Sequence, residues 1–132
     1  MDEQTQVTIS IDGRKSIVET ADLRAQLQQA QDVEFAEVWL ERGPEMLSLL
    51  TNSAQQRAFL MFLTEENQAG FHALDNSSVE QDAEIDFFLN NGQQDQYEFS
   101  DTIALSEGIR AVEFFFAHGG RAPFILWQDD SV

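Results

Sequence analysis

The sequence predicts an α+β fold, in which two helices pack on one face of a mostly antiparallel sheet. Short runs rich in apolar residues recur along the chain between turn signals, and such runs are typical of strands. Two other segments repeat their apolar residues at helical spacing, one near each end of the chain. The length of 132 residues suits one domain, and a hydrophobic content of 42% can build its core. We therefore treat residues 1–132 as a single domain.

The N-terminal segment predicts a hairpin followed by the first helix. Val7–Ile11 alternates as a half-buried strand does, and Asp12-Gly13 is a strong hairpin turn signal. Ser16–Glu19 is either the return strand or a capping box that starts the helix early. We favour Thr20 as the N-cap, because a helix from there carries its apolar residues on one face. Those residues are Leu23, Leu27 and Ala30.

The centre of the chain predicts a series of strands. The predicted strands are Phe35–Arg42, Glu45–Thr51, Ala58–Thr64 and Phe71–Leu74. The predicted connections are the turns Gly43-Pro44 and Asn67–Gly70 and the polar loop Asp75–Gln81.

Glu84–Leu89 and Gln94–Phe99 predict a hairpin around Asn90-Asn91-Gly92. A two-residue turn would place Tyr97 opposite Asp86. A three-residue loop with Gly92 in the left-handed conformation would place Tyr97 opposite Ile85 instead. We favour the longer loop, because it puts the apolar residues on one face of the hairpin. That face would hold Ile85, Phe87 and Tyr97, and the other would hold Glu84, Asp86, Phe88 and Glu98.

The C-terminal segment predicts a second helix, from Leu105 to Ala117. Its expected buried stripe is Leu105, Ile109, Val112 and Phe116. Gly119-Gly120 is expected to end the helix, because glycine adopts the left-handed conformation readily. Phe124–Trp127 is then expected to form the last strand.

The net charge of −17 is the most pronounced feature of the composition. It arises from 24 acidic residues and seven basic ones. A field of this sign repels nucleic acid and anionic membranes and attracts basic proteins. No lysine or arginine occurs between Arg57 and Arg110, a stretch that contains eleven acidic residues. Because a solvated surface normally mixes both signs, this block favours a docking surface for a basic protein.

Three features indicate a cytoplasmic location. The first residues are polar and acidic, unlike a signal peptide, and no apolar run has the length of a membrane span. The chain also contains no cysteine. We therefore expect no contact with membranes.

The sequence contains few candidates for catalytic or metal-binding residues. His72 and His118 have no second ligand at metal spacing and no activated nucleophile motif, so we expect structural roles for both. Asp82, Glu84 and Asp86 alternate, but their spacing does not match a calcium loop. We therefore expect no catalytic residue, no metal and no cofactor, and a protein that is not an enzyme. The residues that we expect to bind a partner are Asp82, Glu84, Asp86, Phe88 and Glu98.

The C-terminal run Tyr97–Trp127 resembles the signature of immunity protein family 1 of bacterial polymorphic toxin systems. The similar features are the amphipathic helix ending at Phe116, the glycine- and proline-containing turn Gly119–Pro123, and the strand closing on Trp127. The resemblance covers about a third of the chain well. It implies an α+β protein that neutralises a cognate toxin, usually of the nucleic-acid deaminase class.

This resemblance suggests a fold and a partner class but identifies no binding residue. A toxin that acts on nucleic acid is expected to carry a basic cleft, which an acidic inhibitor complements. The alternative is an acidic mimic of nucleic acid, or an adaptor, that blocks another basic protein. A weaker alternative is a small hydrolase with paired carboxylates, a pattern that 24 acidic residues always supply.

Overall fold

The computed structural model describes residues 7–17, 20–65, 69–77 and 82–131. Within these ranges, antiparallel pairing builds one large sheet in the order β10-β6-β5-β4-β3-β1-β2. Its strands are β1 (Val7–Ile11), β2 (Arg14–Ile17), β3 (Phe35–Arg42), β4 (Glu45–Asn52), β5 (Arg57–Leu63), β6 (Phe71–Leu74) and β10 (Leu126–Asp129). The short β9 (Ile103–Ala104) pairs with β5 beside this path.

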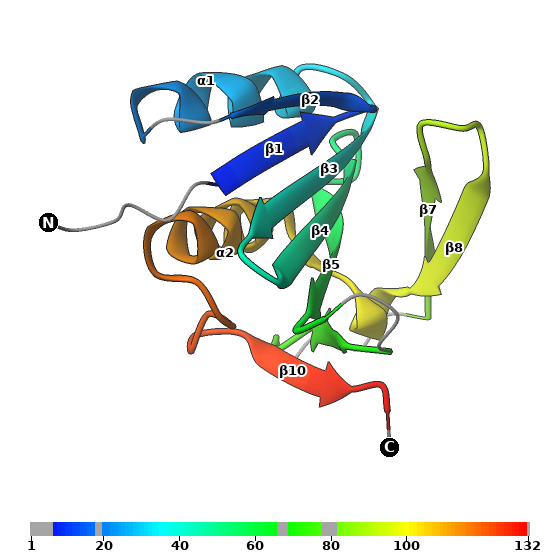
Figure 1. Cartoon of the computed structure of the whole chain (residues 1–132). Helices are drawn as coiled ribbons and strands as arrows, with labels where there is room; N and C mark the ends of the chain where they lie inside the picture. Colours follow the sequence, from blue (N-terminus) through cyan, green and yellow to red (C-terminus); the bar gives the residue numbers. More distant parts are fainter. Residues whose placement is uncertain (1–6, 18–19, 66–68, 78–81, 132) are drawn as a thin grey trace, which may run out of the picture.

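The other elements form a layer on each side of the sheet (Figure 1). The helices α1 (Thr20–Gln31) and α2 (Leu105–His118) lie on one face. The strands β7 (Glu84–Phe88) and β8 (Gln94–Glu98) form a separate hairpin on the other face, followed by the 3-10 turn η1 (Phe99–Asp101). The predicted α+β class, with two helices on one face of an antiparallel sheet, is confirmed.

Alternation along the strands gives the sheet two different apolar faces. In β4, Leu47 and Leu49 point toward the helices, whereas Leu50 points toward the hairpin. The helix side holds the larger core, in which Phe62 of β5 meets Phe115 of α2 edge-on at 6.2 Å between ring centroids. The hairpin therefore has a smaller core of its own.

The first hairpin turns at Asp12-Gly13, as the sequence indicated, but its return strand begins earlier than expected. Asp12 and Gly13 both have positive φ, 49° and 86°, which makes a tight two-residue turn and places Arg14 opposite Ile11. The return strand is therefore Arg14–Ile17 rather than Ser16–Glu19, of which residues 18 and 19 lie outside the described residues. Helix α1 begins at Thr20, and the predicted N-cap role of its side chain lies outside what the structure describes. Its predicted face is confirmed, because Leu23, Leu27 and Ala30 are all buried.

The middle strands occur where predicted, with small shifts. β3 and β6 have the predicted bounds, and β5 begins and ends one residue earlier than predicted. The predicted Asn67–Gly70 turn and Asp75–Gln81 loop lie partly outside the described residues, at 67–68 and 78–81.

Of the residues predicted for the buried stripe of α2, Leu105 and Val112 are buried, whereas Ile109 is only partly buried. Phe115 is fully buried and Phe116 only partly, and Gly108 faces the sheet. A Cβ atom on Gly108 would lie 2.8 Å from Leu49 Cδ1 and 3.2 Å from the Cβ of Ala58. The missing side chain therefore lets α2 approach the sheet on that side, and a pattern of large apolar residues does not reveal such a contact. Gly119 ends the helix as predicted, with φ of 73°.

The last strand begins later than predicted. It spans Leu126–Asp129, because Phe124 and Ile125 belong to a turn that contains Pro123, in which the amide of Ile125 donates to the carbonyl of Ala122. Trp127 lies opposite Ala73 of β6, and its Nε1 donates to the carbonyl of Ala122 at 3.0 Å.

Across the described ranges, no helix combines the length and the apolar character needed to cross a membrane.

Candidate protein-binding surface

The β7–β8 hairpin carries the residues that the sequence predicted to bind a partner. Gly92 has φ of 88°, and its amide donates to the carbonyl of Leu89 at 2.9 Å. The amide of Leu89 donates to the carbonyl of Gln93, which leaves Asn90-Asn91-Gly92 as a three-residue loop. Ile85 is therefore opposite Tyr97, and the predicted register is confirmed.

The inner face of the hairpin anchors it on β4 and β5. Phe87 is completely buried and Ile85 nearly so. The ring of Tyr97 stacks on Phe59 with centroids 3.8 Å apart, and Asn52 Nδ2 donates to the carbonyl of Asp86 at 2.9 Å. Burial raises the pKa of Tyr97 to about 12, and the neighbouring Asp95 adds to the effect. Tyr97 is thus part of the hairpin core, on the apolar face that the sequence predicted.

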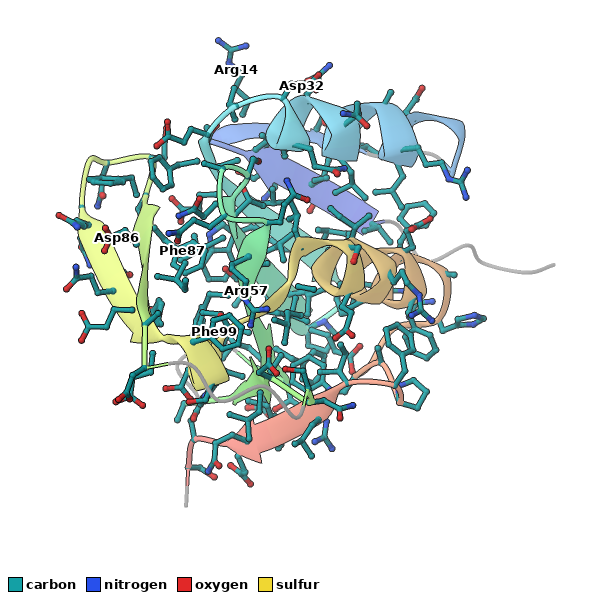
Figure 2. The ribbon with its side chains drawn as sticks, turned by 180° about the vertical axis from the view of Figure 1, so that it is seen from behind. Arg14, Asp32, Arg57, Asp86, Phe87 and Phe99 are labelled. Atoms are coloured by element: carbon teal, nitrogen blue, oxygen red, sulfur yellow. The ribbon has the colours of Figure 1, made fainter. Side chains whose placement is uncertain are left out.

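The outer face presents the predicted residues together. We call this surface the hairpin face, and its members are Asp82, Glu84, Asp86, Phe88 and Glu98. Glu84 is directly opposite Glu98, and Gln96 Nε2 donates to Asp86 Oδ1 at 2.7 Å. Figure 2 shows Asp86 and Phe87 on opposite sides of the hairpin, Phe87 toward the sheet.

The charges of the hairpin face are not neutralised within the molecule. In the described part of the chain, none of its carboxylates forms an ion pair. Residues 82–101 include six acidic residues and no basic one. Two like charges directly opposite each other on paired strands destabilise the pair, so Glu84 and Glu98 lower the stability of the hairpin. The basic residues lie elsewhere, such as Arg24 beside Glu113 and Arg121 over the ring of Phe71.

Phe88 gives the hairpin face an apolar residue at the end next to the loop. It is 39% exposed, and its ring meets that of Phe35 at the start of β3 edge-on, 4.8 Å between centroids. Val33, two residues before Phe35, is also exposed. The structure thus adds Phe35 and Val33 to the predicted surface. Neither residue could be predicted from the sequence, because the contact between Phe35 and Phe88 joins segments far apart in the chain.

Glu37 holds the hairpin loop against the large sheet. Its Oε1 accepts from the amide of Asn90 at 2.9 Å, and its Oε2 accepts from Trp39 Nε1 at 2.8 Å. The backbone of Glu37 exchanges hydrogen bonds with Asp12 in the β1–β2 turn, one to the Asp12 amide and one to its carboxylate. One acidic residue in the middle of β3 therefore connects two turns, a role that its position in the sequence does not indicate.

Arg57 fixes the other end of the hairpin. It is buried, lies 3.8 Å from the centroid of the Phe99 ring, and donates to Asp75 Oδ2 at 2.6 Å (Figure 2). It also donates to the side chain and the carbonyl of Thr102. Burial alone would raise the pKa of Asp75, but hydrogen bonds from Ser77 and the charge of Arg57 outweigh it and hold that pKa below its usual value.

His72 lies between two carboxylates, and no hydroxyl group is among its hydrogen-bond partners in the described residues. Its Nδ1 is 2.7 Å from Asp130 Oδ1, and its Nε2 is 3.0 Å from Asp101 Oδ1. These contacts connect β6 with η1 and with the residue after β10. Over the described residues, no group of three or more histidine or acidic side chains is arranged to hold a metal ion.

No family model matches the chain, and no curated protein matches it.

Proposed function

We propose that the protein is an immunity-type inhibitor, which binds a basic toxin domain one to one and blocks its action. The observation that carries this proposal is the hairpin face, where carboxylates that form no ion pair among the described residues share one face with a partly exposed phenylalanine. Solubility would favour acidic residues there, but it gives no reason to expose Phe88. An aromatic anchor with a charged rim is the usual anatomy of a protein-binding hot spot.

The charge also suggests which kind of toxin is bound. A domain that acts on nucleic acid carries a basic cleft for the phosphate backbone. The hairpin and its flanking residues, 82–101, contain six acidic residues and no basic one, which complements such a cleft. The resemblance of Tyr97–Trp127 to immunity proteins supports the same partner class. The proposal places the protein in the cytoplasm, where such a toxin would reach nucleic acid.

The rigid attachment of the hairpin suits this role. The hairpin is held by Phe87 and Tyr97 in its core, by Glu37 at its loop and by Arg57 at its base. A surface that is already ordered loses little conformational entropy on binding, which favours high affinity. The proposed mechanism is therefore occlusion by a preformed surface and involves no chemistry.

Co-expression with a toxin domain encoded beside this gene tests the proposal. We expect the protein to rescue the cells and to elute with the toxin domain as a 1:1 complex in gel filtration. Asp86→Lys is expected to reduce rescue, whereas Leu126→Lys, an exposed position on β10, should not. Toxicity that persists with no complex would rule out the immunity function. Equal binding to unrelated basic enzymes of nucleic acid would instead support a general acidic mimic.

A further inference from the structure

A crevice opens beside the hairpin face, between α1 and the β1–β2 hairpin. It encloses about 580 Å³. Its apolar wall is formed by Ile9, Ile11 and Val33, and its polar lining includes Asp12, Gln26 and Asn90. The volume is within the range of ligand sites, but the crevice is open on one side. An open crevice of this kind is suited to a side chain that enters from a docked protein.

The crevice is continuous with the hairpin face. Asn90 belongs to the loop of the hairpin, two residues after Phe88, and it also lines the crevice. On the other side, Val33 lines the crevice, and Phe35 two residues later contacts the ring of Phe88. A partner that covers Phe88 would therefore reach the mouth of the crevice without leaving the surface.

Two side chains that line the crevice, Gln26 and Asp12, carry hydrogen-bond acceptors. Gln26 Oε1 is buried and, among the described residues, has no hydrogen-bond partner. An unsatisfied buried acceptor costs free energy that a donor from outside would recover. Asp12 contributes a carboxylate, of which Oδ1 accepts from the amide of Glu37.

The charge around the crevice favours a cationic group. Asp12 is part of the lining, and Asp32 and Glu34 flank Val33 in exposed positions. Among the described residues of the lining, Arg14 is the one basic residue, and it is exposed, with its side chain extending away from the body of the molecule (Figure 2). Arginine fits this combination of surfaces, because its stem packs on apolar side chains while its planar head donates to several acceptors at once. Lysine offers only a point charge.

We propose that an arginine side chain of the basic partner inserts into this crevice, with its stem against Ile9, Ile11 and Val33 and its guanidinium toward Gln26 and Asp12. This inference rests on the proposed function and extends its binding surface from the hairpin to α1. The partner then bridges two layers of the molecule, and the crevice selects among basic partners by the position of one arginine.

A titration with N-acetyl-arginine amide tests the crevice by itself. Amide and side-chain NMR signals of Gln26, Val33 and Asn90 should shift and saturate. The matched citrulline amide, which has the same shape and no charge, should shift them far less. Val33→Arg, which would place a cation and its stem at the crevice, should abolish the saturable shifts. Equal shifts with both compounds, or unsaturated shifts spread over all acidic residues, would overturn the inference.

The complex with the toxin domain gives the second test. Val33→Arg and the volume-conserving Gln26→Leu should each weaken binding by roughly tenfold or more. The control is Leu126→Arg, which makes the same change of charge on exposed β10. If both crevice variants bind as tightly as the natural chain, the inference is wrong and the immunity function stands. If the natural chain binds no such toxin domain, the function fails, and the amide titration still decides whether the crevice accepts arginine.

Discussion

Phe87 and Phe88 are neighbours in the sequence and have opposite environments in the structure. Phe87 is completely buried between the hairpin and the large sheet, whereas Phe88 is 39% exposed beside Phe35. The difference follows from the pleat of β7, which sends successive side chains to opposite faces.

Truncating each ring should therefore have a different effect. Phe87→Ala should lower the free energy of unfolding by about 3–5 kcal/mol, the usual cost of removing a buried ring. Phe88→Ala should leave most of the stability and cost about 2 kcal/mol of toxin binding. Denaturant melts and titration calorimetry measure the two effects. A collapse of the fold in Phe88→Ala, with Phe87→Ala unaffected, would contradict the structure.

Tyr97 provides a direct optical check of the hairpin core. Burial raises its pKa to about 12, above the value near 10 of a free tyrosine. Because the chain contains one tyrosine, phenolate absorbance reports this side chain alone. We expect no phenolate to form as the pH passes 10 while the protein is folded. A transition near pH 10 would mean that Tyr97 is solvated.

The same shift predicts how stability changes in alkali. When folding raises the pKa of a group, the folded state favours the protonated form of that group. The contribution of the group to stability is therefore complete at pH values below its pKa in the unfolded state. That contribution is lost as the pH rises from about 10 to about 12. Tyr97→Phe should remove this loss, which a series of melts across that range would detect.

At the scale of elements, the Arg57–Asp75 pair connects β5 to the loop after β6 and to the base of the hairpin. Both side chains are mostly buried, and removing one partner of a buried pair leaves an uncompensated charge. Arg57→Met should therefore destabilise the protein by about 3–5 kcal/mol. Lys15→Met is the matched control, because the Lys15–Glu41 pair is exposed.

The lowered pKa of Asp75 makes the stability of the protein depend on pH in the acidic range. Because the pKa of Asp75 is lower in the folded state than in the unfolded state, its ionised form stabilises the protein at pH values above its unfolded pKa, which is near 4. This stabilisation is lost as the pH falls through the pKa of Asp75 in the folded state. Asp75→Asn should be less stable at neutral pH and should lose less stability on acidification. Urea midpoints at several acidic pH values would show this, and parallel curves for both proteins would exclude the linkage.

At the scale of the whole molecule, the acidic and basic residues are unevenly distributed. The hairpin layer is purely acidic over residues 82–101, whereas Arg24 and Arg110 project from the helix layer. A protein with this asymmetry orients a basic partner before contact, which raises the rate of association.

We therefore expect the association rate with the toxin domain to fall steeply with added salt, while the dissociation rate changes less. A double variant, Glu84→Gln with Glu98→Gln, should lower the rate and the salt dependence together. The double variant Asp22→Gln with Glu107→Gln is the control, since it removes equal charge from the two helices. Stopped-flow measurements over a series of salt concentrations compare the association rates of the two variants. An association rate that does not depend on salt would mean that the acidic charge serves solubility and does not steer binding.

Much of the fold could be predicted from the sequence, because local rules decide it. Asp12-Gly13 and Gly92 set their turns through backbone conformation alone, and the turn at Gly92 sets the register of its hairpin. With the register known, the pleat assigns Glu84, Asp86, Phe88 and Glu98 to one face. The acidic block without a base is likewise a property of the chain itself.

Contacts between distant segments were decided only by the tertiary structure. Phe115 replaced Phe116 in the core because Gly108 lets α2 approach β4 and β5, and a periodic pattern assigns no burial to a glycine. Glu37 links two turns because it lies within hydrogen-bond distance of Asp12 in the β1–β2 turn and of Asn90 in the hairpin loop. The crevice and the contact of Phe35 with Phe88 exist only where α1, β1 and the hairpin loop meet. Local patterns determine which way a side chain faces along its own element, and packing between elements determines what it meets.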